Sequence, residues 1–154
     1  MFREIRRKDR ELPMEESLEI LKNGEYGVLS TSDQEGQAYG IPLSYVYKDD
    51  AIYFHGAREG HKLDNISSNP KVSFCVVGKT SVVPERFSTN YESVIAFGEI
   101  GEVKEEEKQA ALMELIFKYS PDFVEGGKLY VEKSGSKAHL FKMNVIRITG
   151  KGRK

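Results

Sequence analysis

The sequence is poor in the residue types that mark disulfide-linked, metal-binding and membrane proteins. Its 154 residues contain one cysteine, Cys75, which excludes an intramolecular disulfide and any metal site built from several cysteines. Tryptophan is absent. No segment approaches the ~20 apolar residues that a membrane-spanning helix needs, and no apolar stretch follows the basic N-terminal residues as in a secretory signal. We therefore expect a cytoplasmic protein with no membrane partner and no metal site.

An excess of charge of one sign is also lacking. The chain has 23 basic and 24 acidic side chains, which give a formal net charge of −1. Proteins that bind nucleic acid usually present a positive surface. The clustered basic residues lie near the two ends, in RRKDR (6–10) and KGRK (151–154), where solvated tails are common. We expect no nucleic-acid partner.

The sequence does have the alternation of side chains that is typical of β-strands. The clearest strand is predicted over 38–47, where the large side chains occur at every second position: Tyr39, Ile41, Leu43, Tyr45 and Tyr47. The other predicted strands cover residues 26–32, 51–56, 71–78, 93–103 and 138–150. The segment 79–91 is predicted as a loop, and Gly98 and Gly101 are expected to mark bulges or bends.

Three helices are predicted between these strands. One covers 14–22, where Pro13 suits the beginning of a helix and Asn23-Gly24 its end. A short helix is predicted over 61–69, and the longest over 104–119, before Pro121. Strands and helices do not alternate regularly, which disfavours a parallel sheet. The pattern indicates one domain, mainly β with α, built as an antiparallel β-barrel with flanking helices.

The stretch IYFHGAREGHK (52–62) suggests a binding site for phosphate. It ends a predicted strand, and Gly56 and Gly60 permit tight turns and close approach of a ligand to the backbone. His61 and Lys62 then stand where a helix begins, and a helix N-terminus beside a cation favours an anion. Similar turns occur in proteins that bind no ligand, so a solvated loop is the alternative. No P-loop or dinucleotide glycine signature is present, so a nucleoside triphosphate is not indicated.

In their order and spacing, four segments together resemble the pyridoxamine 5'-phosphate oxidase-like, FMN-binding split-barrel superfamily. They are GVLST, GQAYGIPLSYVY, AIYFHGAREGHKLDNISSNPKVSF and YESVIAFGEIGEV. The chain is most similar to the 5-nitroimidazole reductase (Nim) family, over roughly residues 5–150. The resemblance implies a single FMN-binding split-barrel domain over 1–154 with six antiparallel strands. It also implies a homodimer with the cofactor in clefts at the subunit interface.

The resemblance also assigns residues to the site. The implied cofactor contacts are Ile41, Pro42, Leu43, Ser44, Tyr45, His55, Gly56, Ala57, His61, Lys62 and Ser93. His61 and Lys62 correspond to the Arg-Lys pair that grips the FMN phosphate in the oxidase, and a bidentate donor is lost where histidine replaces arginine. Ser93 falls where the oxidase has a flavin-contacting glutamine. His55 corresponds to the histidine that nitroimidazole reductases place near the substrate, and it is our candidate for catalysis.

Departures from the oxidase pattern argue against oxidation of vitamin B6. The Arg-Pro…Ser motif that binds the substrate phosphate is replaced by FKYSPDFVEGG (117–127), and Tyr45 stands where the oxidase has a substrate-contacting lysine. The leading hypothesis is an FMN-dependent oxidoreductase that reduces a small planar acceptor such as a nitroaromatic compound. The alternatives are a non-catalytic flavin carrier or sensor, and a member of the same superfamily that binds haem or a deazaflavin.

Overall fold

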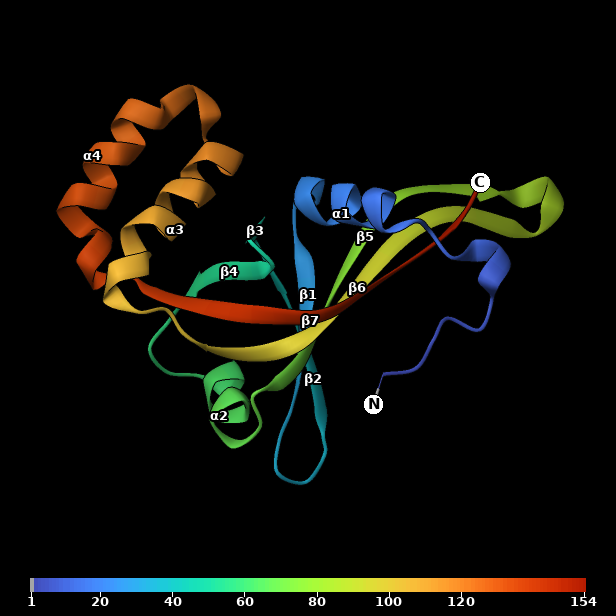
Figure 1. Ribbon diagram of the computed structural model, residues 1–154, viewed down its shortest axis with the longest axis horizontal. Coiled ribbons are helices and arrows are strands. Elements are labelled where there is room, and N and C mark those ends of the chain that lie inside the picture. Colours follow the sequence, from blue (N-terminus) through green and yellow to red (C-terminus); the bar gives the residue numbers. More distant parts are fainter. Residues whose placement is uncertain (1) are drawn as a thin grey trace.

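The computed structural model describes residues 2–154, which form one antiparallel sheet of seven strands with four α-helices around it (Figure 1). The strand order is β2-β1-β5-β6-β7-β4-β3, so the sheet is not closed and β2 and β3 are its edges. The strands are β1 (Gly27–Ser32), β2 (Ala38–Leu43), β3 (Val46–Lys48), β4 (Ala51–Gly56), β5 (Lys71–Val83), β6 (Ser88–Glu102) and β7 (His139–Arg153). The helices are α1 (Met14–Asn23), α2 (His61–Ser68), α3 (Glu105–Tyr119) and α4 (Val124–Ser134).

This architecture confirms the prediction of a mainly β protein with helices and fits a split barrel, but the strand count is seven rather than six. The predicted strand over 38–47 is in fact two strands, because the chain leaves the sheet at Ser44 and Tyr45. β2 and β3 consequently lie at opposite edges of the sheet. Among residues 2–154, no helix is long and apolar enough to cross a membrane.

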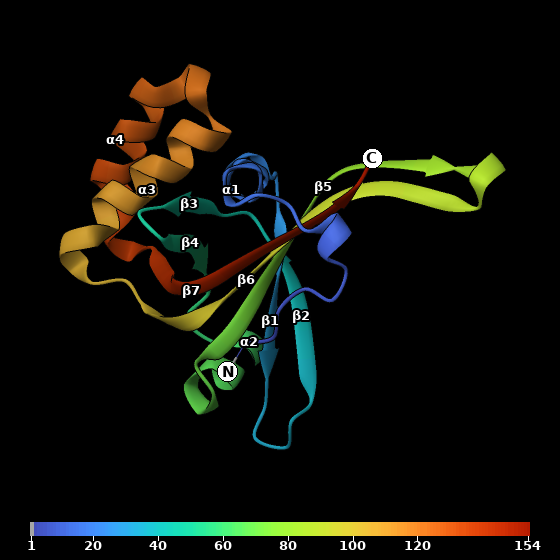
Figure 2. The same cartoon turned by 45° about the vertical axis from the view of Figure 1, so that its right-hand side comes forward.

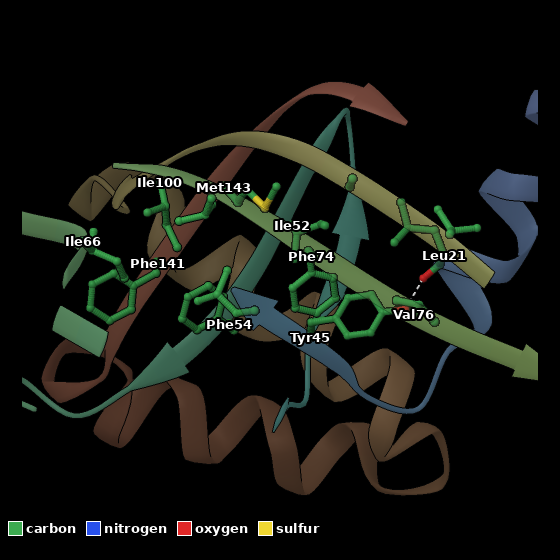
Figure 3. Close-up of a cluster of buried hydrophobic side chains, with 14 residues drawn as sticks. Leu21, Tyr45, Ile52, Phe54, Ile66, Phe74, Val76, Ile100, Phe141 and Met143 are labelled. Atoms are coloured by element: carbon green, nitrogen blue, oxygen red, sulfur yellow. Dashed lines mark hydrogen bonds between the residues drawn. The ribbon is translucent and has the colours of Figure 1, made fainter. Parts of the chain in front are cut away.

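Tyr45 explains the break in the predicted strand. Its N–H donates to the Tyr119 hydroxyl at 2.9 Å, and its carbonyl accepts from the Lys118 amine at 2.9 Å. Its phenol is fully buried and donates to the carbonyl of Leu21 at the end of α1 (Figure 3). Tyr45 thus bonds to residues of α1 and α3 instead of pairing with a neighbouring strand. The side chain still points inward, but the neighbouring Val46 is buried as well, so the predicted alternation stops at this break.

The predicted loop over 79–91 is the second correction. β5 and β6 continue through it as a paired hairpin, which projects away from the rest of the sheet (Figure 2). The hairpin turns through a short 3-10 helix at Pro84–Arg86, followed by Phe87 with a left-handed φ of 50°. Pro84 and the polar residues around it favour a loop locally, but the backbone hydrogen bonds between the two strands override that preference.

The main hydrophobic core fills the inner face of the sheet (Figure 3). Its fully buried large side chains come from strands, from α1 and from the segment after β2: Leu21, Leu29, Tyr45, Ile52, Phe54, Phe74, Val76 and Met143. β1 alternates buried and partly buried residues, as a strand with one face on the core does. A smaller cluster of Ala111, Leu112, Val131 and Leu140 lies between α3, α4 and β7.

α4 was not predicted, because its first turns contain Gly126 and Gly127, which weaken a helix. The second of these glycines is required by packing. A Cβ on Gly127 would lie 2.5 Å from Cγ2 of Ile116 on α3, so the two helices approach closely at this point. In the strand over 93–103, Gly98 does mark a bulge, since the register with β7 shifts between Phe97 and Gly98. Gly101 pairs regularly with Lys142 and marks none.

Candidate functional site

The segment after β4 forms the turn and helix start that the sequence predicts. Gly60 has φ of +140° and ψ of 175°, a backbone conformation that residues with a Cβ rarely adopt. α2 begins at His61 directly afterwards, and no side chain caps its N-terminus. The amide groups of the first turn are therefore open to an external acceptor, and the helix dipole makes this end partially positive.

Lys62 reaches back from α2 over the end of β4. A Cβ added to Gly56 would lie 3.1 Å from Cε and 3.2 Å from Nζ of Lys62, so only a glycine leaves the present position of the lysine clear. Among residues 2–154, no carboxylate lies within salt-bridge distance of Lys62. An unpaired cation beside uncapped helix amides is suited to bind a phosphate group.

His61, the first residue of α2, lies against the edge strand β2. Its imidazole stacks on the ring of Tyr39, with centroids 4.0 Å apart and planes 23° apart. Farther along α2, the side chain of Asn65 donates to the Thr31 hydroxyl at 3.0 Å, and that of Asn69 donates to the Ser32 hydroxyl at 3.0 Å. The helix is therefore fixed to β1 and β2 over its length.

β2 supplies the segment that the resemblance places beside the flavin ring. Ile41 and Leu43 turn their side chains to the core, while Pro42 and Ser44 are exposed. Within residues 2–154, β2 pairs only with β1, so the backbone groups along its outer edge remain free to bond a ligand. Tyr45 differs, because its side chain is buried and its N–H and C=O both have partners within the protein. Tyr45 therefore has neither an exposed side chain nor an unpaired backbone group to offer a ligand.

His55 does not point toward Lys62. Successive side chains of a strand face opposite sides, and a Cβ on Gly56 would face Lys62 and the buried Phe141. His55, one residue earlier on β4, is exposed and faces away from this inner side. Ala57 is exposed in the turn that follows. The structure therefore brings Gly56, His61 and Lys62 together around α2 and separates the His55 imidazole from them.

Ser93 lies far from this group. It pairs with Val77 and Lys151 in the part of β6 nearest the hairpin. The other end of β6, at Glu102, pairs with Phe141 close to Gly56. Nine residue steps lead from Ser93 to Glu102, which corresponds to roughly 30 Å of extended strand. Within one subunit, Ser93 and the part of β6 near Gly56 therefore lie toward opposite ends of this strand.

Comparison with known proteins identifies the family. A family model described as pyridoxamine 5'-phosphate oxidase matches residues 13–151 of the chain. The chain belongs to the pyridoxamine 5'-phosphate oxidase-like family. No curated protein matches the sequence. This family membership confirms the resemblance that the sequence segments indicate.

Solved structures share the fold of this family member. A candidate 5-nitroimidazole antibiotic resistance protein from Bacteroides thetaiotaomicron aligns with a TM-score of 0.78 at 23% identity, over 92% of this chain and 86% of that one. An FAD-binding protein from Mesorhizobium loti aligns with a TM-score of 0.63 at 20% identity, over 94% of this chain and 98% of that one. An FAD- and haem-binding protein from Mycobacterium smegmatis aligns with a TM-score of 0.79 at 14% identity, over 92% of this chain and 72% of that one. Identities this low show a common fold.

Sequence reasoning missed two contacts of this oxidase-like chain that hold candidate site segments. Tyr39 was noticed only as part of the alternation in 38–47, and nothing in the sequence indicates its stack with His61. Lys118 and Tyr119, at the end of α3, fix the backbone at Tyr45, 73 and 74 residues away along the chain. Such long-range contacts leave no periodic signal in the sequence.

Lys118 provides a test of this arrangement by pH. Its Nζ lies 3.7 Å from the centroid of the Tyr45 ring, and burial lowers its pKa from 10.5 to about 8. Between pH 8 and 10.5, Lys118 is more protonated in the unfolded chain than in the folded protein. Its contribution to the free energy of unfolding therefore increases as pH rises from about 8 to 10.5. We expect urea denaturation to show wild type gaining stability relative to Lys118→Met across this range. Parallel pH profiles of the two proteins would contradict the burial of the amine.

Proposed function

We propose that this protein binds FMN and uses it as an oxidoreductase to reduce a small planar acceptor such as a nitroaromatic compound. The observation that carries the proposal is the Lys62 amine over Gly56, on a residue that directly follows the uncapped start of α2. A phosphate at the start of α2 would accept hydrogen bonds from backbone amides and from Lys62, and His61, the first residue of the helix, is proposed as a second basic donor. Charge-assisted bonds of this kind are the strongest that a protein offers a phosphate.

The outer edge of β2 would then receive the flavin ring. Its free backbone groups can bond the polar edge of an isoalloxazine, and Pro42 can offer its carbonyl and the face of its own ring. The flavin, when bound, supplies the redox chemistry, while the protein positions it and limits access to it. Family membership and the FAD-binding names of two relatives support a flavin in general.

We further propose that the functional unit is a homodimer whose cofactor lies between subunits. Ser93 is the reason, because it is roughly 30 Å along β6 from the phosphate site of its own chain. If Ser93 contacts the flavin, it must contact one whose phosphate is held by a second copy. Analytical ultracentrifugation of the purified protein measures this directly, and a monomer that binds FMN at full affinity would remove Ser93 from the site.

The test of the proposed cofactor is a visible absorption spectrum of the protein as purified, followed by titration with FMN. We expect bands of oxidised flavin and saturation near one FMN per subunit. The spectrum separates the other ligands found among the relatives, since haem gives an intense band near 400 nm and FAD is distinguished after release from the protein. A protein that takes up haem and no flavin would overturn the proposal. Saturation with FMN but no reduction of any acceptor would favour a carrier or sensor.

His55 is our proposed proton donor to the acceptor, and its position makes a specific prediction. Because its imidazole faces away from Lys62, we expect His55→Ala to leave the dissociation constant of FMN unchanged. Loss of a general acid usually lowers the rate by 10²- to 10⁴-fold, and a fall of about that size is expected in acceptor reduction. Steady-state assays with a nicotinamide donor and nitroaromatic acceptors measure it. Full activity of this variant would exclude His55 from the mechanism.

A further inference from the structure

Tyr39 contacts His61 of the proposed phosphate site, a contact that neither the sequence pattern nor the family resemblance indicates. The Tyr39 and His61 rings are nearly parallel, with centroids 4.0 Å apart. His61 is exposed at the first position of α2, and Tyr39 is partly buried on β2. Among residues 2–154, Tyr39 is the only aromatic residue whose ring contacts the His61 imidazole.

Tyr39 is itself held in place by the sheet and by α2. It pairs with Thr31 on β1, and its carbonyl accepts from the Thr31 hydroxyl at 3.3 Å. The same hydroxyl accepts from the side chain of Asn65 on α2 at 3.0 Å. Thr31 and Asn65 are both buried. Tyr39 therefore offers a fixed ring face, tied through its backbone to the same helix that carries His61.

A fixed ring matters because an exposed histidine would otherwise sample several rotamers. Ordering one such side chain on binding costs about 0.5–1.5 kcal/mol, and aromatic stacking is worth a similar amount. A histidine that is already stacked in the free protein loses little further conformational freedom when the ligand binds. The stack also turns the edge of the imidazole, which carries its N–H groups, away from the Tyr39 ring face.

We infer that Tyr39 is a positioning residue of the phosphate site, which holds the His61 imidazole ready at the N-terminus of α2. Through His61 it selects flavins that carry a phosphate over riboflavin, which carries none. This role rests on the proposed function, because it presumes that α2 receives the phosphate of FMN. It adds a third residue to His61 and Lys62 and compensates in part for the arginine that His61 replaces.

The experiment measures dissociation constants of FMN and riboflavin by fluorescence titration in wild type, Tyr39→Leu and Tyr39→Phe. We expect Tyr39→Leu to weaken FMN about three- to tenfold, the range that a stacking contact of this size implies, while riboflavin changes less than twofold. Tyr39→Phe keeps the ring and should retain wild-type selectivity. Equal weakening of both flavins would show a merely structural role, and no change in either would also overturn the inference.

A double-mutant cycle tests whether Tyr39 acts through His61. In the His61→Ala background, Tyr39→Leu should change FMN affinity less than twofold, because the residue it positions is gone. Additive effects of the two substitutions would overturn the inference. Riboflavin binding in each variant, together with circular dichroism, shows whether α2 is still formed.

The stack can also be detected without flavin. In the free wild-type protein, the ring current of Tyr39 should shift the His61 carbon-bound ring protons upfield in NMR spectra, and Tyr39→Leu should remove the shift. Unshifted His61 resonances in wild type would overturn the inference by themselves. A wild type that binds neither flavin would overturn the proposed function and this role with it. Normal FMN binding with unchanged selectivity in Tyr39→Leu would overturn this role alone.

Discussion

Substitution of Gly98 by alanine is expected to destabilise this protein more than any other change proposed for it. A Cβ at this position would overlap the backbone carbonyl oxygen of Asn144 and lie 2.9 Å from its carbonyl carbon. Both atoms belong to the main chain of β7 at the bulge, so no side chain can rotate away. The two longest strands would have to separate at the centre of the sheet. We expect a loss of about 4 kcal/mol or more in the free energy of unfolding, measured by urea denaturation.

Gly101→Ala is the matched control on the same strand. It is exposed, pairs in regular register with Lys142, and a Cβ there would meet no atom within 4 Å. Its free energy of unfolding should stay within about 0.5 kcal/mol of wild type. If Gly98→Ala proved as stable as Gly101→Ala, the close crossing of β6 and β7 at the bulge would be wrong.

The second large effect is expected at Lys62. Replacing it by methionine keeps most of the aliphatic chain but removes the cation that lies over Gly56. A hydrogen bond to a charged group is worth about 1.5–3 kcal/mol, so FMN should bind roughly 10- to 150-fold more weakly. Riboflavin should bind to the variant as it does to wild type. Isothermal titration calorimetry with both ligands measures the difference.

Two further variants make the Lys62 experiment decisive. Lys128→Met makes the same change of charge on the exposed face of α4 and should leave FMN affinity unchanged. Gly56→Ala retains the lysine but introduces a Cβ 3.2 Å from its Nζ, so the amine must move by a few tenths of an ångström. We expect a several-fold loss of FMN affinity with little loss of stability. Unaltered FMN binding by Lys62→Met would place the phosphate elsewhere.

Local features of the sequence determine much of this protein. The alternation predicted from residue 38 onward decides that Ile41 and Leu43 face the core, because a strand turns successive side chains to opposite sides. The start of α1 at Met14, the end of α3 at Tyr119 and the bulge at Gly98 were each predicted from nearby residues. The turn at Gly60 and the start of α2 directly after it are equally local, so both were predictable from one short segment.

Only the tertiary structure decided the features that depend on residues far apart in the sequence. Tyr45 leaves the sheet because Lys118 and Tyr119 bond its backbone, and α4 tolerates Gly127 because Ile116 occupies the space of a side chain. The opposite facing of His55 and Lys62 and the separation of Ser93 likewise follow from how β4, α2 and β6 are placed. Periodicity reports which side of its own strand or helix a residue occupies. It carries no information on which distant group will lie against that side, and that contact sets the geometry of the site.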